Sequence, residues 1–159
     1  MEFRAFGGAA AADGGGSVTF DAGTQTLTGT YQIAGETLVA GSTVNFSAAS
    51  PTTIASLRMT SGTLGGSSAI DVTGLFTWSN GTVTGGPAAF TASGGISFNS
   101  SSAFLNGRTL NHTSASPGAV IQAGLGGTLY LANAATFNNQ TGAVFEVQND
   151  QGAFYYTGT

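Results

Sequence analysis

The 159-residue chain lacks most of the residue types on which functional sites depend. It has no cysteine, no lysine and a single histidine, His112, and only 6% of its residues are charged, against about 25% in an ordinary domain. A zinc site draws on several histidine or cysteine ligands, and nucleic-acid binding needs a basic face. Three arginines and a net charge of −4 do not supply one. The composition therefore predicts no cofactor, no metal site and no nucleic-acid partner.

Long apolar runs and helical patterns are also missing. No run approaches the roughly 18 residues that cross a bilayer as a helix, so no membrane span is expected. Glycine and threonine are poor helix formers, and no stretch repeats apolar residues at helical spacing for three turns. A basic segment followed by an apolar one, as in a signal peptide, is not visible either.

The chain is instead rich in serine, in threonine and above all in glycine, which occupies 26 positions. Disorder is not expected, because 41% of the chain is hydrophobic and eleven positions are phenylalanine, whereas disordered chains have few aromatics. Two apolar residues separated by one polar residue recur, which is typical of short half-buried strands. The clearest examples are Val18–Phe20, Tyr31–Ile33, Val44–Phe46, Ile70–Val72, Phe76–Trp78 and Ile96–Phe98.

These strands align at a constant spacing of 26 positions. One column contains Val18, Val44, Ile70 and Ile96, and another contains Phe20, Phe46, Val72 and Phe98. A repeat of this length without helices predicts an all-β parallel β-helix, or solenoid, whose coils stack at about 4.8 Å. We expect about six coils of about 26 residues each, and the right-handed form is favoured. An antiparallel sandwich is the alternative, but it gives no reason for columns at a fixed phase.

The domain organisation follows from where this pattern holds. Residues 17–159 are predicted to form the solenoid domain. After residue 108 the spacing drifts, since Thr109–Asn111 recurs as Thr136–Asn138, at an interval of 27. Residues 1–16 are rich in glycine and alanine and lack the period, so we expect a linker, an irregular cap or a strand donated to a neighbouring copy.

Three segments, FTWSNGTVTGG, FLNGRTLN and ATFNNQTGAVFEVQND, resemble the degenerate repeats of bacterial extracellular β-solenoid proteins. This is the class of autotransporter passengers and large surface adhesins, and the resemblance runs from about residue 17 to 150. It implies a secreted or cell-surface right-handed β-helix that serves as a stalk, adhesin or filament. It carries over no catalytic residue.

Four aromatic residues share the 26-residue spacing and form the candidate binding site. We expect them to stack on successive coils, either as an interior ladder or as an exposed strip that binds sugar rings or another protein. They are Trp78, Phe104, Tyr130 and Tyr156.

Candidate catalytic and modification sites are few. No acid falls on another acid in the 26-residue grid, so neither a carboxylate pair for glycoside hydrolysis nor any other catalytic residue is predicted. His112 is expected to cap a turn or to lie on the surface. Five Asn-x-Ser/Thr sequons would accept glycans if the source glycosylates exported proteins; they are Asn45, Asn80, Asn99, Asn111 and Asn139.

The sequence thus favours a non-enzymatic extracellular or cell-surface solenoid that acts as a filament subunit, stalk or adhesin segment. The partner expected first is a second copy, because the terminal coils of a solenoid present unpaired strand edges. A carbohydrate-binding or carbohydrate-degrading β-helix is the alternative. Ice binding is a third hypothesis; it needs an unbroken threonine ladder, whereas Thr26 and Thr52 are followed by Trp78 at the 26-residue spacing.

Overall fold

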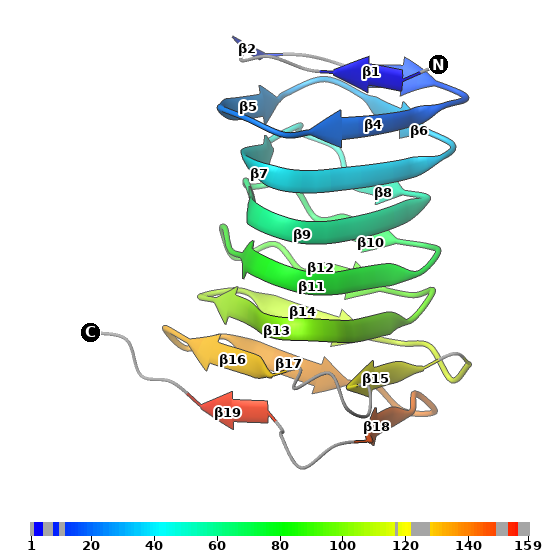
Figure 1. Cartoon of the computed structure of the whole chain (residues 1–159), viewed down its shortest axis with the longest axis vertical. Helices are drawn as coiled ribbons and strands as arrows, with labels where there is room; N and C mark the ends of the chain where they lie inside the picture. Colours follow the sequence, from blue (N-terminus) through cyan, green and yellow to red (C-terminus); the bar gives the residue numbers. More distant parts are fainter. Residues whose placement is uncertain are drawn as a thin grey trace.

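A computed structural model shows the chain as a parallel β-solenoid (Figure 1). The structure describes residues 2–4, 8–9, 12–116, 118–121, 128–148 and 153–155. The all-β parallel architecture predicted from the sequence is confirmed. In Figure 1 the chain runs leftward along the front strands and returns behind them as it descends from the N-terminus, which is a right-handed winding. Within the described ranges, no helix is long and apolar enough to cross a membrane.

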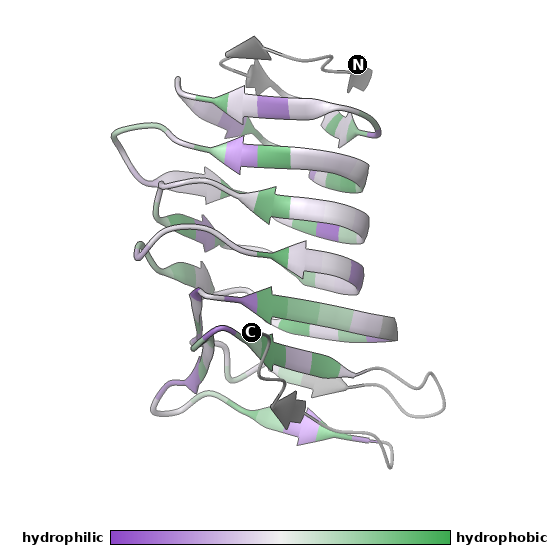
Figure 2. Cartoon of the chain, turned by 90° about the vertical axis from the view of Figure 1, so that its left-hand side faces the viewer, coloured by the Kyte–Doolittle hydropathy of each residue, from purple (hydrophilic) through white to green (hydrophobic). Residues whose placement is uncertain are grey.

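Each turn has three faces. The first face carries the strands that open a turn, the second carries those that follow the first corner, and the third carries short returning strands. Four long strands bend at the first corner and belong to both the first and the second face, as their curled ribbons show in Figure 2. These are β7 (Glu36–Phe46), β9 (Ser56–Gly65), β11 (Phe76–Val83) and β13 (Ile96–Asn106).

The remaining strands each lie on one face. The first face adds β1 (Glu2–Arg4), β4 (Ser17–Phe20), β15 (Ala119–Ile121) and β18 (Phe145–Val147). The second adds β2 (Gly8–Ala9), β5 (Thr24–Leu27), β16 (Leu129–Ala132) and β19 (Ala153–Tyr155). The third consists of β3 (Ala12–Gly14), β6 (Tyr31–Ile33), β8 (Thr52–Ile54), β10 (Ile70–Val72), β12 (Phe90–Ala92), β14 (Thr109–His112) and β17 (Thr136–Asn139).

The turns of the stack are shorter than the sequence pattern predicted. Thr37 pairs with Val18 in the turn above and with Leu57 in the turn below, at offsets of 19 and 20. Phe76 pairs with Leu57 and with Ile96 at the same two offsets. The expected period of 26 was therefore wrong for the turns down to His112. The predicted column that joined Val18 directly to Val44, Ile70 and Ile96 is not a ladder of this fold.

The 26-residue spacing has a different physical origin. Because each of these shorter turns has three faces, a step of 26 positions passes through one turn and about one further face. Val18 accordingly lies on the first face, Val44 on the second, Ile70 on the third and Ile96 on the first again, four turns below. All four are buried. The spacing thus identified inward-facing residues but assigned residues from three faces to one column.

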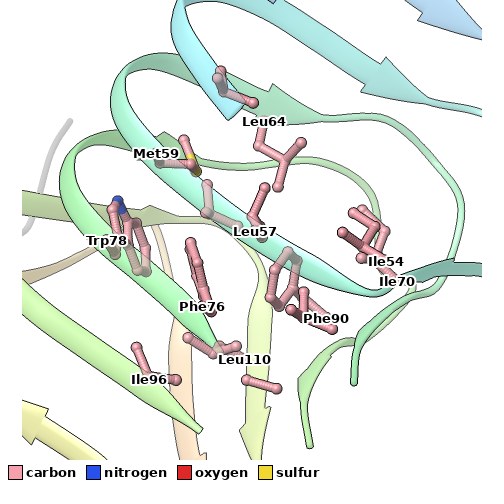
Figure 3. Packing of buried hydrophobic residues seen from close by; sticks show 14 of the residues in the cluster. Ile54, Leu57, Met59, Leu64, Ile70, Phe76, Trp78, Phe90, Ile96 and Leu110 are labelled. Atoms are coloured by element: carbon pink, nitrogen blue, oxygen red, sulfur yellow. The ribbon is translucent and has the colours of Figure 1, made fainter. Parts of the chain in front are cut away.

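The interior is filled by apolar rows in which each turn contributes one side chain. Figure 3 shows part of this core, with Phe76 and Trp78 side by side at a ring separation of 5.1 Å. A fully buried side chain of this size contributes about 1.5–3 kcal/mol of hydrophobic stabilisation. One row of the first face consists of Phe20, Val39, Met59, Trp78 and Phe98, all at most 1% exposed.

Glycine is required where the long strands turn the first corner. Gly62 has a φ of 87° and Gly81 a φ of 96°, a region that other residues rarely adopt. A Cβ on Gly62 would lie 2.3 Å from the carbonyl oxygen of Ser42, and one on Gly81 would lie 2.6 Å from that of Gly62. The turns therefore stack at these corners without room for a side chain.

The two ends of the stack differ. At the N-terminal end, the described strands β1, β2 and β3 pair with β4, β5 and β6; the division into residues 1–16 and a solenoid domain 17–159 stays a prediction. Beyond His112 the turns lengthen, since Phe137 pairs with Leu110 and Phe145 with Ala119, offsets of 27 and 26. The predicted match of Thr109–Asn111 with Thr136–Asn138 is confirmed.

Candidate functional site

The second face carries a threonine ladder that the 26-residue spacing concealed. Thr24 pairs with Thr43, Thr43 with Thr63, and Thr63 with Thr82. Thr24 is exposed and the others are partly exposed, while the residues that follow them point into the core. No hydrogen bond of the four hydroxyls to described protein atoms occurs, so they remain available to solvent. The missed signal was the recurrence of threonine at a spacing shorter than the assumed period.

A second outward row runs beside this ladder. Thr26 pairs with Asn45, and Asn45 with Gly65. The Thr84 amide donates to the Leu64 carbonyl at 2.8 Å, which places Thr84 in the same row one turn below. Both rows are uncharged and consist of residues no larger than asparagine. Over four turns this face therefore presents hydroxyl, methyl and amide groups.

Two aromatic residues end the threonine ladder below. Phe104 pairs with Thr82 and with Tyr130, and both rings lie partly exposed on the outer surface. The rings are stacked, with centroids 4.6 Å apart and an interplanar angle of 11°. Because they cover each other's faces, the surface between them shows ring edges to solvent. A sugar ring stacks on an aromatic face, so this pair does not form the expected continuous sugar-binding strip.

Trp78 does not belong to that aromatic pair. It pairs with Phe98 and Met59 on the first face, is 0% exposed and donates its indole N–H to the Gly81 carbonyl at 3.3 Å. Of the expected single column of four aromatics, the step from Phe104 to Tyr130 is confirmed. The step from Trp78 to Phe104 was wrong, because there a spacing of 26 residues moves from the first face to the second. Tyr156 lies outside the described residues. Of the two predicted alternatives, Trp78 takes the interior position, whereas Phe104 and Tyr130 lie on the outer surface.

A hollow lies on the third face between the turns that carry β6 and β8. Here β6 belongs to a separate two-stranded sheet and is not hydrogen-bonded to β8. Two adjoining hollows of about 380 and 320 Å³ follow this interruption and share Tyr31, Gln32 and Thr53. Both linings are uncharged; the larger is rich in hydroxyl groups, whereas the smaller is mostly apolar. Sequence reasoning missed this site, because an interruption between two strands leaves no pattern in the residues.

In the part of the chain that the structure describes, charged side chains of the outer surface lie on the first and third faces, and Asp21 lies at the first corner. On the first face, Arg58 donates to both carboxylate oxygens of Glu36, at 3.0 and 2.7 Å. These hydrogen bonds raise the pKa of Arg58. On the third face, Ser93 donates to Asp71 at 2.5 Å. In these contacts each carboxylate accepts a hydrogen bond from a donor side chain, and neither lies beside a second carboxylate as in a catalytic pair.

Arg108 is a buried cation that connects three turns. It is 2% exposed and donates to the carbonyls of Ser68, Thr84 and Ala88 at 2.6, 3.0 and 3.2 Å. Burial lowers the pKa of Arg108 to about 10. Because it satisfies corner carbonyls that would otherwise be unpartnered, its role is structural.

His112 is buried, so the expectation that it caps a turn or lies on the surface was wrong. Its Nδ1 is 2.8 Å from Oδ1 of Asn139, and its ring is stacked on Phe137 at 6.2 Å. Its Nε2 has no hydrogen-bond partner among the described residues. Within the same part of the chain, no three residues of the His, Cys, Asp and Glu types gather around a position that could hold a metal ion.

The predicted glycan acceptors differ in accessibility. Asn80 is exposed at the first corner, where its Oδ1 accepts the Gly81 N–H at 2.6 Å. Asn139 is held on both sides, since its Oδ1 contacts His112 and its Nδ2 donates to the Ala143 carbonyl at 3.0 Å. Glycosylation stays a prediction, and Asn80 is the better presented of these two. Partly exposed positions are occupied by Asn45, Asn99 and Asn111.

Comparison with known proteins gives no relative: no family model, no curated protein and no solved structure matches the chain.

Proposed function

We propose that the chain is a non-enzymatic structural or adhesive module of an extracellular or cell-surface protein, a filament subunit, stalk or adhesin segment whose copies associate end to end. The solenoid fold supports a rod-like role, because each turn contacts only its neighbours and the stack grows along one axis. The likeness of its repeat segments to autotransporter passengers and surface adhesins supports the location. The separation of the carboxylates, with Glu36 and Asp71 on different faces, supports a role without catalysis.

The observation that carries the self-association is an open strand edge at the C-terminal end. β18 pairs with β15, and no other described strand lies beside it. Ala119 donates its N–H to the Val144 carbonyl at 2.8 Å. Because N–H groups alternate in direction along a parallel strand, the N–H of Val147 points away from β15. It is therefore available to the edge strand of another copy.

Exposed apolar side chains gather at the same end. Val144 is 50% exposed and Val147 is 45% exposed. At the opposite end, β1 pairs with β4 and has no second partner among the described strands. Docking one end on the other would continue the parallel ladder and remove both valines from water. The net charge of −4 opposes this association only weakly.

Sedimentation velocity over a concentration series up to the millimolar range, with electron microscopy of the densest sample, tests the proposal. We expect axial oligomers or filaments that grow with concentration. Val147→Lys places a charge on the open edge and should shift the chain to monomers. Leu75→Lys is the matched control, because it adds the same charge to a 40% exposed side chain on a middle turn, and it should leave association unchanged. A wild-type chain that stays monomeric at every concentration overturns the proposal.

Carbohydrate binding is a second candidate, favoured by the hollow between β6 and β8. Its volume of about 380 Å³ lies in the range of small-molecule sites, and its hydroxyl lining suits an uncharged oligosaccharide. A peptide strand does not fit between β6 and β8. Their two turns are hydrogen-bonded to each other on the first and second faces and so lie only one strand spacing apart. Titration with neutral oligosaccharides should show binding that Gln32→Ala weakens and Thr91→Ala, farther down the same face, does not. Equal affinities of the two variants exclude this hollow as the site.

A further inference from the structure

The geometry of the second face points to an ice-binding surface, with the threonine ladder Thr24, Thr43, Thr63 and Thr82 as its centre. We infer that this face binds the surface of ice crystals, a ligand that is itself a regular array of hydrogen-bonding groups. The inference is independent of the proposed end-to-end association, because it depends on a lateral face and not on the strand edges.

The spacing of the hydroxyl groups is the first argument. Paired strands lie about 4.7–4.9 Å apart, and alternate residues of one strand about 6.6 Å apart. Thr24, Thr43, Thr63 and Thr82 therefore form one complete column of a two-dimensional grid. The second column has threonine at its two ends, Thr26 and Thr84, with Asn45 and Gly65 between them. The distance between paired strands is close to the shorter repeat distance of the oxygen lattice of ice. Water molecules bound to such a grid can join an ice surface without rearrangement.

The rigidity of the ladder is the second argument. Threonine is β-branched, so its χ1 angle is restricted, and neighbours in register restrict it further. Each strand of the ladder is also fixed between two others, because β7 and β9 are paired along their upper and lower edges. Little conformational entropy is therefore lost when the hydroxyls of Thr43 and Thr63 bind an ordered surface.

The distribution of charge over the three faces is the third argument. A charged side chain holds its own hydration shell and would disturb an ice-like water layer. The first face carries the Glu36–Arg58 ion pair, and the third carries Asp71. On the second face, the described outward residues of the four ladder turns include no charged side chain.

A preference of threonine for strands does not by itself explain the ladder. Threonine has a high β-propensity on any outward strand position, and it also occurs on the third face. There, however, the outward row passes from Thr53 to Asp71, Thr91 and Asn111. The uninterrupted ladder is thus specific to the face that also lacks charge.

The lower end of the face limits its size. Phe104 and Tyr130 continue the row, but their stacked rings replace hydroxyl groups with bulky edges. Four turns at about 4.8 Å give a ladder roughly 15 Å long. Because each water-mediated contact is weak and many must act together, we expect inhibition of ice recrystallisation to be more pronounced than the depression of the freezing point.

Measurements of ice recrystallisation and of ice-crystal shape with purified chain test the inference. We expect the wild type to inhibit recrystallisation and to facet growing crystals. Thr63→Tyr places a large ring in the middle of the ladder and should abolish most of this activity. Thr91→Tyr, on an outward position of the third face, is the matched control and should leave it unchanged. Melting temperatures of both variants establish that they are folded.

A milder variant keeps the test valid if Thr63→Tyr does not fold. Thr43→Val retains the branched shape and removes one hydroxyl, so it should lower the activity in proportion to the lost contact while the fold persists. The inference is overturned if the wild type neither inhibits recrystallisation nor shapes crystals at millimolar concentration. It is equally overturned if Thr63→Tyr and Thr91→Tyr reduce the activity alike. The chain used must carry no glycan at Asn45, which lies in the face, or at Asn80, which borders it.

Discussion

Between Ser17 and His112, paired residues are 18 to 22 positions apart, as in Thr52 with Ile70 and Leu105 with Val83. Beyond His112 the offset rises to between 23 and 27, with Ile96 opposite Ala119 and Leu110 opposite Phe137. The upper turns are therefore nearly identical in length, whereas the lower turns are longer. Both regions still place apolar residues in the same interior rows. The register between turns is therefore set by the packing of the interior and not by the length of the turns.

The two regions close their interiors differently. In the upper turns, the third-face strands β10 and β12 bury both their terminal side chains. In the lower turns, Phe137 and Phe145 are only partly buried, and the space between the faces is filled by rings. Phe137 and Phe145 lie 5.1 Å apart, and Phe98 lies 6.4 Å from each. We infer that unfolding begins in the lower region, where fewer side chains are fully removed from water.

Removing one large ring from each region should produce the largest difference. Trp78→Ala leaves a cavity in the closely packed upper core and should lower the free energy of unfolding by about 3–5 kcal/mol. Phe137→Ala removes a half-buried ring and should cost roughly 1–2 kcal/mol. Denaturant unfolding of both variants measures the two values. Equal losses would show that the lower region is packed as tightly as the upper one.

Two glycines with nearly equal backbone angles isolate the effect of stacked corners. Gly62 and Gly142 have φ values of 87° and 85°. A Cβ on Gly62 would meet the Ser42 carbonyl oxygen at 2.3 Å, whereas one on Gly142 meets nothing within 4 Å. Gly142→Ala should therefore cost about 1–2 kcal/mol for its backbone conformation. Gly62→Ala should cost roughly 1–3 kcal/mol more, and a smaller difference in melting experiments would contradict the tight corner.

The comparison also shows which parts of the fold were readable from the sequence. Individual strands such as Ile70–Val72 were predicted from alternation alone, because a half-buried strand alternates apolar inward residues with polar outward ones. The period was not found, since Val18 and Val44 are equally apolar on different faces and alternation carries no information about the face. The match of Thr109–Asn111 with Thr136–Asn138 was correct, because there the longer turn brings the same face back into register.

The candidate site was less readable than the fold. Once the period was set to 26, Thr82 fell outside any threonine column, and Trp78 was joined to Phe104 across two faces. The ladder depends on a register that only the paired strands establish. His112 was placed on the surface because a lone polar residue usually lies there, whereas its hydrogen bond to Asn139 comes from a residue 27 positions away.

The stability of the turn that carries β6 should depend on alkaline pH through the buried Tyr31. Burial raises the pKa of Tyr31 to about 12, and its hydroxyl lies 2.6 Å from that of Thr37. The unfolded phenol ionises near pH 10, so the folded state holds its proton longer and loses up to roughly 2–3 kcal/mol of stability as the pH rises from about 10 to 12. Arg108 acts in the opposite direction, because its pKa is lowered on folding.

The Tyr31→Phe variant separates these two effects. It removes the contribution of the phenol while leaving Arg108 in place, so its stability should fall less steeply than that of the wild type above pH 10. Melting temperatures at intervals between pH 8 and 12 measure both slopes. Parallel curves would mean that the phenol of Tyr31 is not protected in the folded chain.

The smallest effect is expected for the ion pair that joins two upper turns from outside. Arg58 and Glu36 form a two-pronged contact, but their side chains are 43% and 37% exposed. Water and salt screen such a pair, so Glu36→Gln should cost about 0.2–1 kcal/mol and the difference should vanish in high salt. Chemical unfolding in urea at low and at high salt measures it. A loss comparable to that of Trp78→Ala would mean that outer contacts, rather than the interior rows, hold the upper turns together.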